Sequence, residues 1–211
     1  MRRVLSKILS GIVAGILISI GGTICLALLG YDKVVGAILF TVALTTICYK
    51  GYALFTGKVG YIVESHTKDD FETLFLCLLG NLIGAVAFGY MIGFAMPSLS
   101  EVAYMACLAR VENTILQALI KGILCGILMY VAVSVFRENN KNVLGIMLAI
   151  PTFILAGFEH SIADMFYFAC GNLVSLDAFI FLVVVIIGNA IGGMLLPLFQ
   201  KGIKALAPKQ N

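Results

Sequence analysis

The sequence predicts an all-α membrane protein with six transmembrane helices in two inverted three-helix repeats. Composition is the first reason: 61% of the residues are hydrophobic and 12% are charged, whereas a soluble domain has about 25% charged residues. Length is the second, because six spans of about 20 apolar residues each use nearly all of the 211 residues. We therefore expect one transmembrane channel domain over residues 1–211. The net charge of +3 gives no indication of nucleic-acid binding.

An internal repeat is the third reason. Residues 11–17 (GIVAGIL) return as 122–128 (GILCGIL), and residues 80–85 (GNLIGA) return as 188–193 (GNAIGG). We expect repeat one over about 8–95 and repeat two over about 115–199. Three crossings per repeat turn the second copy upside down, an arrangement in which transporters place their site near the midplane. The repeat therefore indicates a transport protein.

Six long apolar segments give the helices in chain order. Their expected boundaries are about 8–30, 34–64, 71–95, 115–136, 143–170 and 174–199. The first segment follows three basic residues, but it is too long for the apolar region of a cleavable signal peptide. We therefore interpret it as the first spanning helix.

The second and fifth segments are too long for one straight helix and carry polar residues midway. Lys50 and Gly51 interrupt the second, and Pro151 followed by Glu159 and His160 interrupts the fifth. Lipid cannot satisfy an unwound backbone, so such breaks face protein or a water-filled cavity. We predict that helices two and five are broken and that the two breaks meet at a pore between the repeats.

The distribution of Lys and Arg predicts the orientation, because these residues are enriched in cytoplasmic loops. With the N-terminus inside, only Lys33 and Arg110 lie outside. Nine lie inside: Arg2, Arg3, Lys7, Lys68, Arg137, Lys141, Lys201, Lys204 and Lys209. We expect a multi-pass protein of the cell (inner or cytoplasmic) membrane with both termini in the cytoplasm.

Four polar residues within apolar segments are candidates for function. An ionisable residue inside a membrane indicates a functional site, and His160 is the central candidate. Glu159 is better interpreted as its support, through the imidazole or through freed backbone amides. Asn81 and Asn189 occupy matching repeat positions, where they could hold the broken segments, line the pore or link helices.

The sequence gives no indication of a metal site, a cofactor or a disulfide framework. The six cysteines lie mostly in apolar segments without CxxC spacing, which is typical of small core residues. A membrane-embedded enzyme using Glu159 and His160 as acid and base is an alternative. No nucleophile–base pair accompanies them, so we do not expect an enzyme.

Several motifs resemble those of the formate/nitrite transporter family. They are residues 157–166 (GFEHSIADMF), 54–57 (LFTG), 122–125 (GILC) and 188–193 (GNAIGG). The resemblance extends from end to end of the chain. It implies a homopentamer of six-helix, aquaporin-like protomers in the lipid bilayer, with one pore each. It also implies passage of small monovalent weak-acid anions: formate, nitrite, hydrosulfide, and in some members acetate or lactate.

The resemblance also implies roles for single residues. His160 matches the central pore histidine, Thr56 the threonine facing it, and Asn189 the asparagine of the sixth helix. Arg110 stands where the family usually has an anion-attracting lysine. The apolar residues implied at the pore constriction are Phe40, Leu44, Leu54, Phe55 and Phe153.

The sequence departs from the family pattern at several positions. Lys58 stands where Asn is common, Lys50 where a small residue is common, and Asp164 where Asn is usual. Ala53 replaces an acidic residue, and Gly126 replaces an Asn. The two added lysines favour an anion, although they could instead be paired with acidic residues or snorkel.

We expect Arg110, with help from Lys50 or Lys58, to concentrate the anion in a vestibule. The anion would take a proton near His160, from the imidazole or by way of water, and cross as the neutral acid. A neutral imidazole that only hydrogen-bonds the anion is equally compatible with the sequence. The alternative function is a neutral small-solute channel of aquaporin-like fold.

Overall fold

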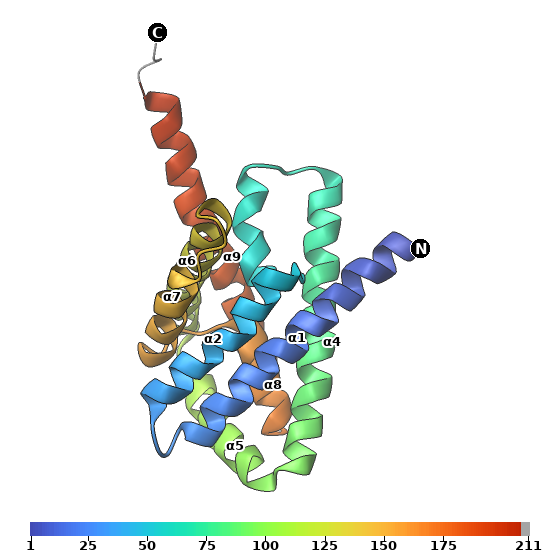
Figure 1. Ribbon diagram of the computed structural model, residues 1–211. Coiled ribbons are helices and arrows are strands. Elements are labelled where there is room, and N and C mark those ends of the chain that lie inside the picture. Colours follow the sequence, from blue (N-terminus) through green and yellow to red (C-terminus); the bar gives the residue numbers. More distant parts are fainter. Residues whose placement is uncertain (208–211) are drawn as a thin grey trace.

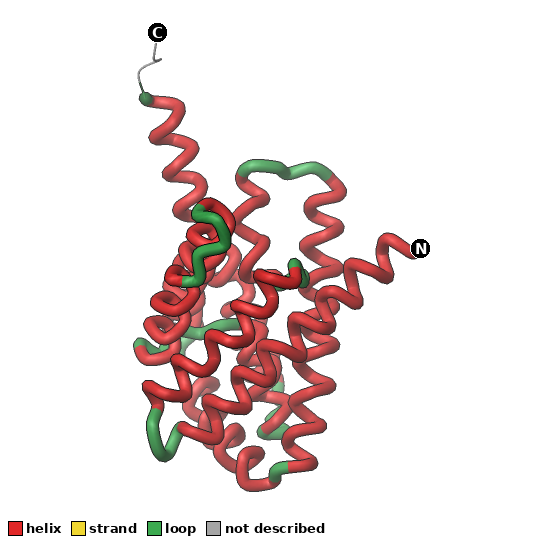
Figure 2. Tube along the Cα trace, in the orientation of Figure 1, coloured by secondary structure: helices red, strands yellow, loops and turns green. Residues whose placement is uncertain are grey.

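The computed structural model describes residues 1–207, which form helices joined by short loops and contain no strand (Figures 1 and 2). The all-α fold class is therefore confirmed. Lys209, counted above for the orientation, lies outside the described residues. The helices are α1 (Arg2–Leu28), α2 (Lys33–Lys50), α3 (Phe55–Lys58), η1 (Val59–Val63, a 3₁₀ helix), α4 (Lys68–Ala95), α5 (Pro97–Val111), α6 (Ile115–Glu138), α7 (Leu144–Leu155), α8 (Ser161–Cys170) and α9 (Leu176–Leu206).

Five of these helices, α1, α2, α4, α6 and α9, are long and apolar enough to cross a membrane, and α7 and α8 are shorter apolar helices. Large apolar side chains also cover much of the outer surface. Examples are Phe75 (66% exposed), Phe94 (90%) and Leu148 (62%). In water such a surface would be unfavourable, so the chain is a multi-pass membrane protein.

Local sequence explains where the helices begin. Thr67 caps the start of α4 in a capping box. Its hydroxyl accepts from the Asp70 N–H, and the Asp70 carboxylate accepts from the Thr67 N–H. Thr114 and Gln117 open α6 in the same way. These side chains satisfy N–H groups that have no partner within the helix.

Close helix contacts depend on glycines at matching places in the two halves. α1 packs extensively against α4, and α6 against α9. A methyl group on Gly80 would overlap the Ile8 carbonyl oxygen, and one on Gly188 would lie 2.7 Å from the Leu119 carbonyl oxygen. Only a residue without Cβ allows these backbones to approach so closely.

Non-helical stretches separate α2 from α3 and α7 from α8. The first follows Gly51 and the second contains Gly157, and both glycines have φ of +72°. A Cβ at either position would meet nothing within 4 Å. Glycine is therefore required here for its backbone conformation and not for space.

Residues 96–114, where the sequence predicts no membrane-spanning segment, contain α5. This helix carries Glu101 and Arg110 among its apolar residues and is too short to span a membrane. Figure 1 shows it at the end of the bundle opposite the projecting end of α9. α9 itself continues to Leu206, beyond the expected end at 199.

Candidate functional site

Asn81 holds the start of α3 in place. Its side-chain Nδ2 donates to the carbonyl oxygens of Gly11 and Ala53, both at 2.8 Å, and its Oδ1 accepts from the Phe55 N–H at 2.8 Å. The residue is fully buried. One amide therefore satisfies backbone groups within the stretch after α2 and at the start of α3, and it ties this stretch to α1.

Asn189 does the same for α8. Its Nδ2 donates to the carbonyl oxygens of Gly122 (2.8 Å) and Glu159 (2.9 Å), and its Oδ1 accepts from the Ser161 N–H at 2.9 Å. It is also fully buried. The two halves thus hold their non-helical stretches with the same three bonds, made to corresponding backbone atoms.

His160 is the last residue of the non-helical stretch before α8 and is 2% exposed. It is the N-cap residue of α8, where its Nδ1 accepts from the Ala163 N–H at 3.2 Å. Its Nε2 lies 2.8 Å from Oγ1 of Thr56 in α3. Because Nδ1 faces an N–H donor, the bonding favours the neutral tautomer with the proton on Nε2.

Aromatic rings enclose the imidazole. The Phe153 ring stacks on His160 with 5.8 Å between centroids, and Phe40 meets Phe153 edge-on at 6.3 Å. Both phenylalanines are buried. His160 therefore presents one polar edge, at Nε2, in an apolar setting.

One cavity adjoins His160 directly. It has a volume of about 70 Å³ and is lined by Phe40, Arg110, Phe153, Ile154, Gly157, Phe158, Glu159, His160, Ala163, Asp164 and Tyr167. We call it the histidine cavity. Its charged and titratable side chains come from α5, α8 and the stretch between α7 and α8.

Arg110 is bound by two carboxyl groups in the histidine cavity. Its Nε lies 3.0 Å from Oε2 of Glu159 and 3.3 Å from Oδ1 of Asp164, and its Nη1 donates to the Ala106 carbonyl oxygen at 3.0 Å. The guanidinium also lies over the Tyr167 ring, 4.9 Å from the centroid. Arg110, whose side chain is 22% exposed, is thus paired with two buried carboxyl groups and is not a free surface cation.

A second cavity of about 200 Å³ contains two basic residues. It is lined by Leu44, Ile47, Cys48, Gly51, Tyr52, Leu54, Gly57, Lys58, Val133, Phe136 and Arg137. We call it the lysine cavity. Lys58 and Arg137 also line an adjoining hollow of about 270 Å³ that contains Glu64 and Asp70. No carboxylate lies within ion-pairing distance of Lys58 or Arg137 among residues 1–207.

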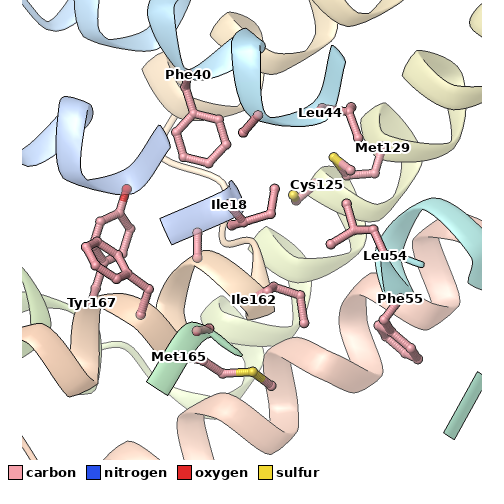
Figure 3. Packing of buried hydrophobic residues seen from close by; sticks show 14 of the residues in the cluster. Ile18, Phe40, Leu44, Leu54, Phe55, Cys125, Met129, Ile162, Met165 and Tyr167 are labelled. Atoms are coloured by element: carbon pink, nitrogen blue, oxygen red, sulfur yellow. The ribbon is translucent and has the colours of Figure 1, made fainter. Parts of the chain in front are cut away.

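The two cavities lie one helical turn apart along α2. Phe40 lines the histidine cavity and Leu44 lines the lysine cavity, and four residues of α-helix rise about 6 Å. Figure 3 shows both side chains on α2, with Leu54 and Phe55 at the start of α3. Buried apolar side chains and the Thr56–His160 contact therefore separate the cavities.

The remaining candidates lie in different surroundings. Phe55 is buried but lines neither cavity, and its backbone N–H bonds Asn81. Lys50 is exposed at the end of α2, in a surface groove that also contains Arg2 and Ser10. The structure therefore places Lys58, but not Lys50, at a cavity next to the centre.

Sequence reasoning did not select Tyr167 or Arg137 for the site. Tyr167 lies three residues after Asp164 on α8, a helical spacing that could have indicated a shared face. Arg137 was counted only for orientation, and its place beside Lys58 depends on packing between distant segments. Among residues 1–207 no three His, Cys, Asp or Glu side chains are placed to hold a metal ion.

Comparisons with known proteins agree on one family. The formate/nitrite transporter model matches residues 1–200. The uncharacterized transporter YwcJ of Bacillus subtilis is 30% identical over 65% of this chain, and the formate channel FocB of Escherichia coli is 26% identical over 78%. The nitrite transporter NirC of Escherichia coli is 31% identical over 62%. The matches cover 59%, 66% and 53% of these relatives, so the chain spans only about half to two thirds of their length.

Two solved structures share the fold. A pentameric formate channel with formate bound superposes with a TM-score of 0.82 at 21% identity, covering 98% of this chain and 99% of that one. An ion channel of the same family gives a TM-score of 0.85 at 23% identity, covering 97% and 91%. From the family match over residues 1–200 it follows that this chain belongs to the formate/nitrite transporter family, whose members are transporters and channels, not enzymes.

Proposed function

We propose that this protein conducts small monovalent weak-acid anions, such as formate, nitrite or hydrosulfide, through a pore centred on His160. The observation that carries the proposal is the 2.8 Å contact between His160 Nε2 and Thr56 Oγ1, buried between two cavities that contain basic residues. The family membership and the names of the relatives, which include formate channels and nitrite transporters, support it.

The proposal includes the architecture of the pore. Six spans in two inverted repeats would place the breaks of helices two and five at the centre, and the matching bonds of Asn81 and Asn189 support this. The pentameric formate channel of the same fold supports a homopentamer with one pore per protomer. The distribution of Lys and Arg supports both termini in the cytoplasm, and the membrane that we propose is the inner membrane.

Basic residues would attract the anion at the lysine cavity, where Lys58 and Arg137 lie. Arg110 lies at the histidine cavity, where Glu159 and Asp164 offset its charge. A field of one sign at a low-dielectric opening raises the local concentration of the opposite charge. The apolar side chains of Phe40, Leu44, Leu54 and Phe153 would then form the constriction.

The apolar constriction favours passage as the neutral acid. Moving a bare anion into an apolar medium costs tens of kcal/mol by Born solvation. Protonating a carboxylate whose pKa is about 4 costs about three pH units at pH 7, or about 4 kcal/mol. The second cost is much smaller, so we propose that the anion is neutralised beside the constriction.

Within this proposal His160 binds the anion and does not carry the proton. Its Nδ1 accepts from the Ala163 N–H, so a second ring proton would have to break that bond. Loss of the Nε2 proton would leave an imidazolate. The ring is therefore suited to donate one hydrogen bond, to Thr56 or to the anion in its place.

Uptake into proteoliposomes tests the function. Formate, nitrite and hydrosulfide are compared across external pH 5.5 to 7.5, with a neutral solute of similar size as the control. We expect saturable uptake of at least one anion that increases as the pH falls. A flux of the neutral solute that ignores pH and salt, with no anion uptake, would instead identify a neutral-solute channel.

A further inference from the structure

The proposed function needs a proton donor, and the histidine cavity offers few. Its titratable side chains are Arg110, Glu159, His160, Asp164 and Tyr167. Arginine stays protonated at all physiological pH values, and tyrosine ordinarily loses its proton only near pH 10. His160 Nδ1 accepts from the Ala163 N–H, so the ring cannot take up a second proton without breaking that bond. The two carboxyl groups are the remaining candidates.

The carboxyl groups of Glu159 and Asp164 share a single hydrogen-bond donor, the Nε–H of Arg110. Both carboxyl groups accept from Nε of Arg110, at 3.0 and 3.3 Å. The side-chain exposures of Glu159 and Asp164 are 7% and 1%. Oδ2 of Asp164 is buried and has no hydrogen-bond partner among residues 1–207, so an acceptor is left open on a residue that lines the cavity.

The charges in this cluster do not balance unless one carboxyl group is protonated. One guanidinium and two carboxylates leave an excess negative charge in an apolar setting, which is strongly unfavourable. Two carboxylates that share one site commonly retain one proton between them. A proton here makes the cluster neutral and allows an O–H···O bond, which is strong when one partner is charged.

We propose that Glu159 and Asp164 together bind one proton and donate it to the anion that enters the histidine cavity. The O–H bond on the carboxyl pair breaks, and its electron pair stays on the carboxylate. A new O–H bond forms on formate or nitrite, or an S–H bond on hydrosulfide, and the neutral acid moves on past Thr56 and His160. The pair then takes another proton from water on the Arg110 side. This inference rests on the proposed function and names its proton donor.

The groups that face the pair leave this assignment intact. Arg110, His160 and Tyr167 line the cavity together with the pair. Cys107 of α5 and Cys125 of α6 lie nearby. Thiols ordinarily ionise above pH 8 and phenols near pH 10. Between pH 5 and 7.5, Arg110 is the one charged neighbour of the pair in the described part of the chain.

The sequence also suggests where this chain differs from its family. The resemblance places Asn at position 164, and an amide cannot share a proton in this way. Asp164→Asn leaves Glu159 and Arg110 as a simple ion pair. Glu159→Gln removes the other carboxyl group of the pair and leaves Asp164 as the only carboxylate bound to Arg110.

Infrared spectroscopy tests the bound proton directly. Wild-type protein in lipid at pH 7 should show the C=O band of a buried protonated carboxyl group. Asp164→Asn and Glu159→Gln should each remove it. Glu101→Gln, an exposed carboxylate on the helix that carries Arg110, is the matched control and should leave it unchanged. Absence of the band in wild type would overturn the inference without any transport measurement.

Formate uptake tests the donation. Wild-type uptake should rise less steeply as the pH falls, because the pair is already protonated at pH 7 and each donated proton is replaced from water. Uptake by Asp164→Asn should keep rising about tenfold per pH unit with the neutral acid in solution. The wild-type rate should therefore exceed that of Asp164→Asn about tenfold or more at pH 7.5, and the two should converge near pH 5. A ratio that does not change with pH, alongside normal wild-type uptake, would overturn the inference alone. No uptake by wild type would overturn the proposed function with it.

Discussion

Thr56 Oγ1 lies 2.8 Å from His160 Nε2, although 104 residues separate them. Both residues lie where a helix starts after a non-helical stretch. Thr56 is the second residue of α3, and His160 directly precedes α8. The contact therefore depends on both halves of the chain and on the asparagines that hold the two stretches.

Replacing His160 with Phe should abolish proton-linked anion uptake while the protein still assembles. The aromatic ring can keep the stacking with Phe153, but the Nε2 donor is lost. The Ala163 N–H also loses its acceptor, at a cost of about 1–3 kcal/mol. His160→Asn keeps an acceptor suited to the N-cap and an amide donor, so we expect partial uptake. Full transport by His160→Phe at every pH from 5 to 8 would rule out the central role.

Replacing Asn189 with Asp should strongly destabilise the protein. The substitution keeps the size but removes the NH₂ group that donates to the Gly122 and Glu159 carbonyl oxygens. Each unsatisfied buried group costs about 1–3 kcal/mol. The fraction of oligomer that survives heating, measured by size-exclusion chromatography, should fall well below that of Ile191→Ala on the outer face of α9. Equal survival of the two variants would show that the amide is dispensable.

The sequence predicts the fold well because apolar composition and glycine spacing are local signals. The polar residues in the second and fifth segments point to the stretches after Lys50 and Leu155, where α2 and α7 end. The bonds of Asn81 and Asn189 are harder to predict, since their partners lie up to 70 residues away. The sequence therefore identifies the two amides as candidates, but it leaves three uses open: holding the broken segments, lining the pore or linking helices.

The Arg110 cluster shows the limit of sequence reasoning. Arg110 meets Asp164 across 54 residues, because α5 packs against α8. A cation in a predicted loop looks like a free attractant for anions, yet two buried carboxyl groups bind it. Lys50 and Lys58 are only eight residues apart in the sequence, but α2 ends at Lys50 and the chain then changes direction. Lys50 therefore lies in a surface groove, whereas Lys58 lines the lysine cavity.

Reversing the charge at Lys58 and Arg137 should slow anion uptake. The double variant Lys58→Glu, Arg137→Glu turns attraction at the lysine cavity into repulsion, and we expect a loss of about tenfold or more at low salt. The loss should shrink at high salt because screening shortens the range of the field. Lys50→Glu is the matched control and should transport normally. The same salt-dependent loss in Lys50→Glu would mean that the field is diffuse and not tied to the cavity.

Replacing Gly126 with Ala should impair assembly. A Cβ at this position would overlap the Asn189 carbonyl oxygen and lie 2.9 Å from the Asn189 Cα, so α6 and α9 would have to separate. Overpacking of this kind typically costs about 1–3 kcal/mol. Gly202→Ala, where a Cβ meets nothing within 4 Å, is the control. A smaller fraction of Gly126→Ala than of Gly202→Ala should survive heating in detergent. Similar survival of the two variants would contradict the close approach of α6 and α9 at Gly126.

Wild-type uptake of the correct substrate should increase as the external pH falls from about 7.5 to 5.5. A carboxylic acid with pKa near 4 remains mostly anionic over this range, so the supply of anion to the cavities hardly changes. As the pH falls, the Glu159–Asp164 pair regains its proton faster after each donation, and each pH unit also makes the neutral form in solution about tenfold more available, which corresponds to 1.36 kcal/mol. A protonophore that equalises pH across the membrane should abolish the accumulation. Radiolabelled formate or stopped-flow nitrite uptake, with and without the protonophore, measures both effects. A flux that follows membrane voltage alone would show that the bare anion crosses, and neutralisation would have to be abandoned even though the family assignment would stand.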